Sequence, residues 1–321
     1  MTNQNIKNPQ EASQINSAAK PQATKGGINN VVTMPIHSLI ADKDYPSGIR
    51  EWMQTAPAEL KYPVLVVAAS MLSVYLTRVR LQYVYDNDGE RSAIVLQVII
   101  EGEQSSGKSF TRYIMRTLMR PFIERDREMR AKEQEYAAMK RRQGKKDGKL
   151  PPEPKTDVTI FPETVSVTMF IKRCDTSVKL YGVPKTHFEF ADEISAIVQS
   201  AKRQFSDLSQ IIKTAYDLGS VYGQDYVSES SYSAVVDALL SFVFCGTRSA
   251  VSRYMNKAAI EGGSVTRTVF CALDSHLGSN PPQFSALSDS QKASLETTLE
   301  KLMALCYNSD GTMHKEIELD M

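Results

Sequence analysis

One short segment of the sequence combines glycine, lysine and hydroxyl side chains at the spacing that binds phosphates. Residues 102–109 fit the phosphate-loop pattern G-x-x-x-x-G-K-[ST] at every fixed position. The glycines let the backbone direct several N–H groups inward, and a following helix adds its positive N-terminal end. Lys108 is then expected to reach the β- and γ-phosphates, and the Ser109 hydroxyl to bind Mg²⁺. The predicted nucleotide-binding residues are Gly102, Ser105, Ser106, Gly107, Lys108, Ser109 and Phe110. The competing explanation is a chance match in a serine-rich turn.

Two adjacent acids, Asp192 and Glu193, follow a second apolar segment and supply the other half of the predicted chemistry. Hydrolysis of a nucleotide needs a carboxylate that holds Mg²⁺ and a group that polarises the attacking water. We assign the metal to Asp192 and the water to Glu193, because both come directly after the strand predicted for residues 186–191. The alternative is an ordinary helix start, since acids favour helix N-termini.

The elements that must position these residues alternate between strands and helices. The predicted strands cover residues 94–100, 157–161, 186–191, 240–245 and 264–273. The predicted helices cover residues 108–120, 124–143, 164–173, 194–202 and 205–216. This alternation, together with the loop, predicts an α/β fold, namely a P-loop NTPase whose mostly parallel sheet is sandwiched by helices. Ligands of such sheets bind beyond the carboxyl ends of the strands, where the loop and both acids fall.

The chain divides into four predicted regions around this core. They are a disordered tail at 1–33, an N-terminal helical region and hairpin at 34–90, an ATPase core at 91–280 with a charged helical insertion at 124–152, and a short C-terminal helical segment at 281–321. In the second region, Ile49, Trp52 and Met53 are spaced to face a core. The hairpin is expected to turn at residues 86–89 and to lead into the strand before the loop.

Composition places the chain among soluble, cytoplasmic proteins. Its 321 residues carry a formal net charge of +1, so any surface that attracts nucleic acid must be local. The four cysteines stand singly, without C-x-x-C spacing, which suits a reducing compartment and argues against structural zinc. No targeting segment is evident, and the longest apolar stretch, residues 64–76, is too short to span a bilayer and is predicted to be a buried helix.

The predicted insertion is highly charged and ends in a basic tract. Asp126 and Arg130, like Glu128 and Lys132, stand at i,i+4 spacing, which supports an exposed helix with ion pairs. The cations of the tract are Lys140, Arg141, Arg142, Lys145, Lys146 and Lys149. On a loop they are candidates for contact with nucleic-acid phosphates, and the alternative is a solvated tip. Weaker candidates for this contact are Lys179 and Lys185.

Taken in order, the motifs resemble the P-loop ATPase domain of phage and mobile-element primase–helicase-like proteins, a family related to AAA+ and superfamily III helicases. The segments that carry the resemblance are YPVLVVAASMLSVYL, EGEQSSGKSF, FPETVSVTMFIKRC, FEFADEIS, IIKTAYDLGS, FVFCGT and GGSVTRTVFCALD, over about residues 50–280. The resemblance implies that Thr247, or less favourably Arg248, senses the γ-phosphate. It also implies that Arg267 reaches the nucleotide of a neighbouring subunit, where such an arginine is worth about 10³–10⁵ in rate. Thr268 stands where the family commonly has phenylalanine, and the alternative for Arg267 is a surface arginine at a strand start.

The function predicted from these motifs is an ATP-hydrolysing nucleic-acid motor, similar to DNA helicases, in the replication of a phage or mobile element. The resemblance implies ATP and Mg²⁺ as cofactors, a homo-oligomeric ring such as a hexamer, single-stranded or forked DNA as substrate, and a primase or other replication protein as partner. A second hypothesis is a nucleotide-dependent assembly or loading factor without unwinding activity, which the exposed charged helix at 124–143 favours. A small-molecule or nucleoside kinase is disfavoured, because the pair Asp192-Glu193 is typical of hydrolysis.

Overall fold

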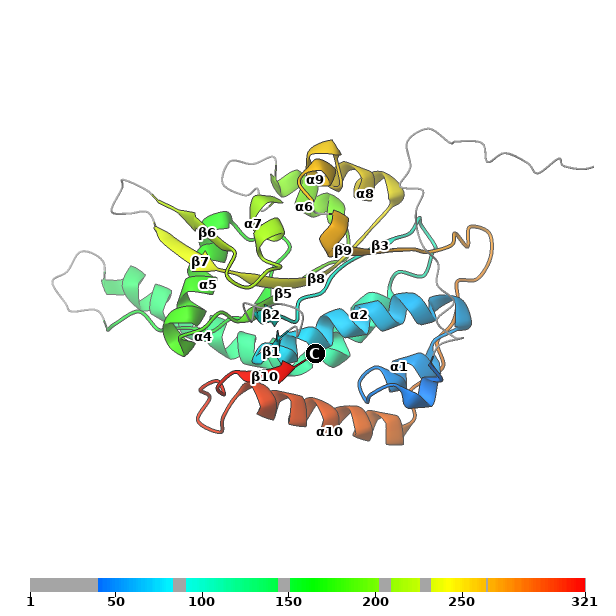
Figure 1. Cartoon of the computed structure of the whole chain (residues 1–321), viewed down its shortest axis with the longest axis horizontal. Coiled ribbons are helices and arrows are strands. Elements are labelled where there is room, and N and C mark those ends of the chain that lie inside the picture. Colours follow the sequence, from blue (N-terminus) through cyan, green and yellow to red (C-terminus); the bar gives the residue numbers. More distant parts are fainter. Residues whose placement is uncertain are drawn as a thin grey trace, which may run out of the picture. The chain divides into compact units, whose positions relative to one another are not determined.

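A five-stranded parallel sheet is the main element of the structure, a computed structural model that describes residues 40–82, 91–143, 151–201, 209–225, 232–263 and 265–320. The strands follow the order β4-β5-β8-β3-β9, and every neighbouring pair is parallel (Figure 1). Their bounds are Gln97–Glu101 for β3, Ile160–Phe161 for β4, Thr186–Ala191 for β5, Leu239–Gly246 for β8 and Thr268–Ala272 for β9. The predicted α/β class with a parallel sheet is therefore confirmed. The predicted tail at 1–33 and the turn at 86–89 lie outside the described residues.

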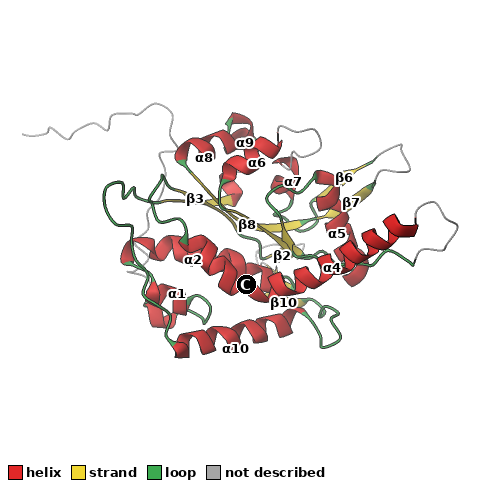
Figure 2. Cartoon of the chain, turned by 180° about the vertical axis from the view of Figure 1, so that it is seen from behind, coloured by secondary structure: helices red, strands yellow, loops and turns green. Residues whose placement is uncertain are grey.

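Helices cover both faces of this sheet (Figures 1 and 2). One layer contains α2 (Lys61–Ser73), α3 (Phe110–Leu118) and α4 (Arg120–Gln143), with α1 (Arg50–Thr55) and α10 (Asp289–Cys306) packed outside α2. The other contains α5 (Val167–Tyr181), α6 (Ile194–Ala201), α7 (Ser209–Thr214), α8 (Arg248–Tyr254) and α9 (Lys257–Glu261). Strand β3 shows how the two cores arise: Val98 and Ile100 join the α2 layer, and Ile99 between them joins the opposite one.

A second sheet, in the order β10-β1-β2, pairs the last described strand with the two strands that precede β3 in the chain. Its strands are β1 (Val79–Gln82), β2 (Arg91–Ala93) and β10 (Ile317–Asp320). The antiparallel pairing of β1 with β2 confirms the predicted hairpin. However, β2 does not belong to the sheet of β3, so the expectation that the hairpin leads directly into the loop strand is wrong. The buried Arg80 of β1 pairs with Glu316 at 2.6 Å, and β10 lies parallel to β1 beside it.

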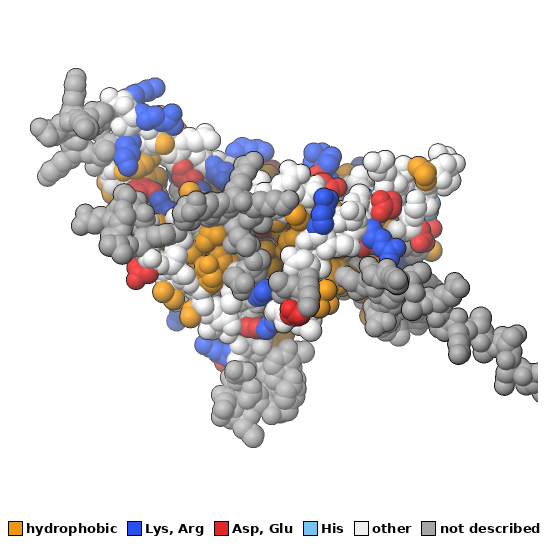
Figure 3. All heavy atoms as spheres, turned by 90° about the horizontal axis from the view of Figure 1, so that it is seen from above, with side chains coloured by type: hydrophobic (Ala, Val, Ile, Leu, Met, Phe, Trp, Pro, Cys, Tyr) orange, Lys and Arg blue, Asp and Glu red, His pale blue; other side chains and the backbone are white. Residues whose placement is uncertain are grey.

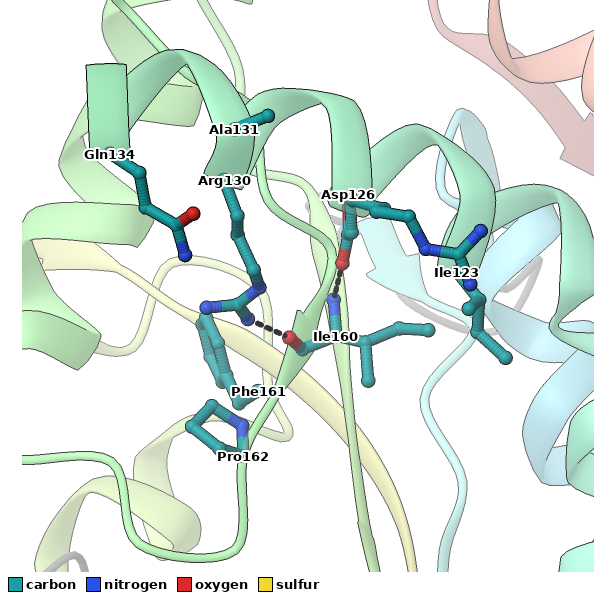
Figure 4. Close-up of a pocket in the computed structure, with 9 residues that line it drawn as sticks. Ile123, Asp126, Arg130, Ala131, Gln134, Ile160, Phe161 and Pro162 are labelled. Carbon is teal, nitrogen blue, oxygen red and sulfur yellow. Dashed lines mark hydrogen bonds between the residues drawn. The ribbon is translucent and has the colours of Figure 1, made fainter. Parts of the chain in front are cut away.

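Helix α4 covers the free edge of the main sheet, and this explains why one predicted ion pair is wrong. Asp126 is 4% exposed and its carboxylate accepts the backbone N–H groups of Thr159 (2.8 Å) and Ile160 (2.6 Å). Arg130 donates to the carbonyl oxygen of Ile160 at 2.8 Å instead of pairing with Asp126 (Figure 4). Because β4 is an edge strand, its outer backbone groups lack a strand partner, and these two side chains replace one.

The segment Ala58–Leu76 is the one described helical stretch with the length and apolar composition of a membrane span, at 19 residues. It includes α2 and the short 3-10 turns Ala58–Leu60 and Val74–Leu76, so it is longer than the predicted apolar stretch. However, 61% of its most apolar 18 residues are buried inside the protein, and Val64, Val67 and Met71 are fully buried. The segment therefore behaves as the predicted core helix.

The described structure contains one further hairpin that the sequence pattern did not predict. It consists of β6 (Val221–Gln224) and β7 (Ala234–Asp237), which pair antiparallel between α7 and β8 in chain order. All four cysteines are free and buried, in agreement with their isolated positions in the sequence.

Candidate nucleotide-binding site

Residues 102–109 form the turn that joins the central strand β3 to helix α3. The N–H of Gly102 donates to the carbonyl oxygen of Gly246 at 2.9 Å, which ties the start of the turn to the end of β8. Ser105 (φ 65°) and Gly107 (φ 82°) both adopt the left-handed conformation, and they flank Ser106. Alternation of left-handed residues turns successive N–H groups toward one side, an arrangement that binds anions. The strand–turn–helix context predicted for the loop is present.

The first glycine of the loop is required by space. A Cβ atom on Gly102 would lie 2.3 Å from the Oγ of Ser106 and 3.0 Å from its Cβ. Ser106 is 1% exposed, and its hydroxyl oxygen has no hydrogen-bond partner in the described structure. A buried hydroxyl without a partner is unusual, because it loses its hydrogen bonds to water without replacement. The loop therefore holds an unused polar group directly beneath its first turn.

Lys108 lies over this loop and its ammonium group contacts the loop backbone. Its Nζ donates to the carbonyl oxygens of Gly102 and, at 3.0 Å, of Glu103. The N-cap residue of α3, Ser109, is exposed, and its hydroxyl makes no capping bond. Both predicted phosphate and metal contacts therefore sit at the positive end of a helix, where an anion is favoured.

The predicted metal ligand Asp192 follows β5 and is already held by two neighbours. Arg112, on α3, directs Nε (2.6 Å) and a terminal nitrogen (2.5 Å) at one carboxylate oxygen of Asp192. The backbone N–H of Asp192 donates to Glu163 at 3.2 Å. Glu193 accepts the N–H of Ser195 at 3.4 Å, at the start of α6. This contact is the one expected if Glu193 only started a helix. It uses one carboxylate oxygen of Glu193 and leaves the other available.

The register of the sheet places Lys108 and the two acids at the same edge. Strand β8 separates β3 from β5, so the ends of these strands are about 10 Å apart at about 4.8 Å per strand spacing. Cys245 lies near the end of β8, the strand between β3 and β5. Burial raises the pKa of its thiol to about 12, and the charges of Asp192, Lys108 and Glu193 also act on it. Its sulfur contacts the hydroxyl of Thr111 at 3.3 Å, which fixes α3 against β8.

The same edge is the point where the chain connections diverge. The connection after β3 leads through α3 and α4 to β4 at one side of the sheet, whereas the connection after β8 leads past β3 to β9 on the other. Parallel α/β sheets bind ligands in the crevice outside such a switch point. The loop at residues 102–109 lies at this place.

Two other predicted residues have different surroundings. Thr247 is the N-cap of α8, and its hydroxyl accepts the N–H of Ala250 at 3.4 Å. It therefore has a structural role, whether or not it also contacts a ligand. Arg267 precedes β9 at the opposite, amino edge of the sheet, where it pairs with Asp217 at 2.9 Å. The strand itself spans about 13 Å at about 3.3 Å per residue, so Arg267 lies away from Lys108 of its own chain.

The predicted nucleic-acid residues are placed in part. Lys140, Arg141 and Arg142 are exposed on the last turn of α4, and Lys145, Lys146 and Lys149 lie outside the described residues. The assignment of Lys185 to nucleic acid is wrong, because its side chain is 1% exposed and its ammonium donates to Asp157. On the face drawn in Figure 3, several Lys and Arg side chains gather at the upper left, and the others are scattered with Asp and Glu side chains among them.

No family model matches this sequence. A search of curated proteins also found no match. The assignment of the site therefore depends on its geometry.

The residues present fit a magnesium-bound nucleotide. Three features of the loop suit phosphate oxygens, namely the close approach at Gly102, the unpartnered Ser106 hydroxyl and the left-handed turn. Ser109 and Asp192 are the side chains at this edge that would hold a magnesium ion, because Mg²⁺ beside a phosphate takes few ligands from the protein. Within the described residues, no group of three or more His, Cys, Asp and Glu side chains is arranged to hold a metal.

Sequence patterns missed three residues at or near this edge. They are Arg112, Glu163 and, inside β5, Glu189. Arg112 stands one helical turn after Lys108, a spacing that indicated only an exposed helix face. Glu163 follows β4, which has two residues and gives no periodic signal of where it ends. Glu189 lies inside a strand that was predicted correctly, and its position in the middle of an apolar segment was the available signal.

Proposed function

We propose that the chain is a magnesium-dependent P-loop ATPase. The observation that carries this proposal is that Lys108 follows β3 and the pair Asp192-Glu193 follows β5 at the same edge of the sheet, with only β8 between the two strands. Generic α/β folds do not require a lysine, an unpartnered buried hydroxyl and two acids at one switch point. Chemistry that needs all of them is phosphoryl transfer to water.

Each residue has a defined task in this mechanism. The N–H groups of the loop and the ammonium of Lys108 bind the polyphosphate, and Lys108 exchanges its bonds to the loop carbonyls for bonds to phosphate oxygens. Magnesium, when bound, would supply positive charge that neutralises the phosphates. Ser109 and Asp192 would hold that ion, and Arg112 would share or release one oxygen of Asp192. Glu193 orients the attacking water and accepts its proton.

We further propose that this ATPase is an oligomeric motor on single-stranded or forked DNA in the replication of a phage or mobile element, as the family resemblance implies. Arg267 lies at the far edge of the sheet from its own Lys108 and pairs with Asp217, so the role that the resemblance implies for it requires a neighbour's nucleotide. The exposed Lys140, Arg141 and Arg142 support a contact with phosphates.

An assembly or loading factor without unwinding activity is the second candidate. One observation favours it: Met139, 41% exposed, lies beside the basic residues on the last turns of α4. A mixed apolar and basic surface suits a protein partner better than a phosphate backbone alone.

ATP turnover with and without single-stranded DNA separates these functions. We expect the wild-type chain to hydrolyse ATP, with several-fold stimulation by DNA for a motor and none for an assembly factor. Glu193→Gln should bind nucleotide and lose at least about 10² in rate. Glu300→Gln, an exposed glutamate on α10, is the matched control and should behave as wild type. Light scattering with a nonhydrolysable nucleotide should show an oligomer, and a strict monomer in both states would contradict the motor.

A further inference from the structure

Glu163 joins the edge strand β4 to the proposed hydrolytic acids. It stands two residues after the end of β4, and its side chain is half-buried. One of its carboxylate oxygens accepts the backbone N–H of Asp192 at 3.2 Å. Asp192 is the first residue after β5, where strand β4 no longer pairs with it. The side chain of Glu163 therefore supplies the acceptor that a neighbouring strand would otherwise provide.

A second carboxyl group, that of Glu189 on β5, has no hydrogen-bond partner within the described residues. Glu189 is 1% exposed, and neither of its oxygens makes a hydrogen bond in the described structure. Its cross-strand neighbours are the buried Phe161 and Phe242. Burial raises the pKa of Glu189 to about 8, and the charge on Glu163 adds to this shift. Glu189 is therefore a neutral acid at pH 7.

A carboxyl group without a partner in an apolar layer lowers the stability of the fold. Costs of this kind concentrate at functional sites, because elsewhere an apolar side chain would serve better. Glu189 lies on β5, three residues before Asp192, which follows the strand, and the charge of Glu163 acts on it. The backbone bond from Asp192 to Glu163 lies at the turn that presents the hydrolytic acids, and the unpartnered acid lies on the strand that leads into it.

We propose that Glu163 is a positioning residue of the hydrolytic site, whose carboxylate fixes the turn that carries Asp192 and Glu193. The proposal rests on the proposed ATPase function. Asp192 is then held twice, through its backbone by Glu163 and through its carboxylate by Arg112. Without Glu163 the turn loses one of these two restraints. A displacement of about 1 Å at such a turn is enough to lower a rate about 10²-fold.

Steady-state ATP turnover of three variants tests this role. Glu163→Ala should lower kcat about 10- to 100-fold while nucleotide affinity stays within about threefold of wild type. Glu163→Gln should keep kcat within about threefold, because its amide oxygen can still accept the N–H of Asp192. Glu153→Ala removes an exposed glutamate that pairs with Lys172, and as the matched control it should be unchanged.

The outcomes separate this proposal from the ATPase proposal. A wild-type chain that hydrolyses ATP, with Glu163→Ala at the same kcat, overturns the role of Glu163 and leaves the ATPase standing. Equal losses in Glu163→Gln and Glu163→Ala also overturn it, since the negative charge would then act in the chemistry itself. A wild-type chain without any ATP turnover overturns both proposals.

The dependence of kcat on pH gives a further test. If Glu163 and Glu189 only stabilised the fold, ionisation of Glu189 would not change kcat. As Glu189 ionises near pH 8, a second negative charge arises beside Glu163, and we expect kcat to fall above that pH. The other titratable group on this face of β5 is His187, which stacks on Phe161, and burial lowers its pKa to about 3, so it stays neutral in this range. Glu189→Gln should keep kcat near pH 7 and remove the fall above pH 8. A profile identical to wild type would overturn the coupling of Glu189 to the turn.

Discussion

Replacement of Gly102 by alanine would place a methyl group in a space that Ser106 already fills. The new Cβ would lie 2.3 Å from the Oγ of Ser106, 3.0 Å from its Cβ and 3.3 Å from the Cβ of Leu273. The backbone cannot simply retreat, because the N–H of Gly102 is bonded to the carbonyl oxygen of Gly246 at 2.9 Å. Ser106 must therefore move, and the loop N–H groups must move with it.

The size of the effect follows from this geometry. Overpacking of a filled space costs about 1–3 kcal/mol, and a strained bond to Gly246 adds up to about 1 kcal/mol. We expect Gly102→Ala to lower the free energy of unfolding, measured by urea denaturation, by about 2 kcal/mol. Calorimetric titration with Mg·ATP should show affinity at least about tenfold weaker, since the phosphate cradle is distorted.

A double-mutant cycle identifies the clashing group. Ser106→Gly removes both the Oγ and the Cβ that meet the new methyl group, so the variant Gly102→Ala/Ser106→Gly should recover most of the lost stability. Ser106→Gly alone is the control. If Gly102→Ala unfolds and binds nucleotide like wild type, or if the double variant is no better than Gly102→Ala, the steric argument for this glycine is refuted.

Three shorter predictions concern the charged groups. Arg112→Ala frees the carboxylate of Asp192 and should lower several-fold the Mg²⁺ concentration that half-saturates binding of a fluorescent nucleotide; an unchanged midpoint contradicts competition at that oxygen. Arg267→Ala should lower ATP turnover with nucleotide affinity retained, and mixing with wild-type subunits should restore activity; no restoration removes the role in trans. Burial tends to raise the pKa of Asp157, but the adjacent ammonium of Lys185 outweighs it and holds that pKa well below its usual range. The stability from Asp157 is therefore complete above about pH 4 and is lost as pH falls. At pH 7, Asp157→Asn should lower the urea-measured free energy of unfolding by about 3–5 kcal/mol, because it leaves Lys185 buried without its counter-charge, and a loss under about 1 kcal/mol would contradict this account.

Local patterns were sufficient for the elements that carry the candidate site. The strand at Thr186–Ala191 agrees with its predicted bounds, because a short apolar segment closes on two acids and a helix start. Helix α3 and the break before α4 also follow from local signals. Pro121 fits the first turn of α4, where its missing N–H costs nothing, and it could not continue α3.

Long-range partners decided what the sequence left open. Asp126 appeared as a surface charge because nothing local reveals that its helix crosses a sheet edge with free backbone groups. Strand β10 needed β1 as a partner, from the other end of the described chain. Lys185 was predicted to be an exposed cation, but its ammonium donates to the buried Asp157, whose carboxylate also accepts the hydroxyl groups of Tyr181 and Tyr307. Positions of this kind depend on tertiary contacts that periodicity does not encode.

The central claim is that Lys108 and the acids after β5 share a magnesium-bound nucleotide, and calorimetric titration of Mg·ATP tests it most directly. Lys292→Ala, which removes an exposed lysine on α10, is the matched control. The wild-type chain and this control should bind one nucleotide per site, and Lys108→Ala should bind at least about a hundredfold more weakly. Equal affinity of Lys108→Ala and wild type, or no heat of binding from wild type at millimolar Mg·ATP, would contradict the account.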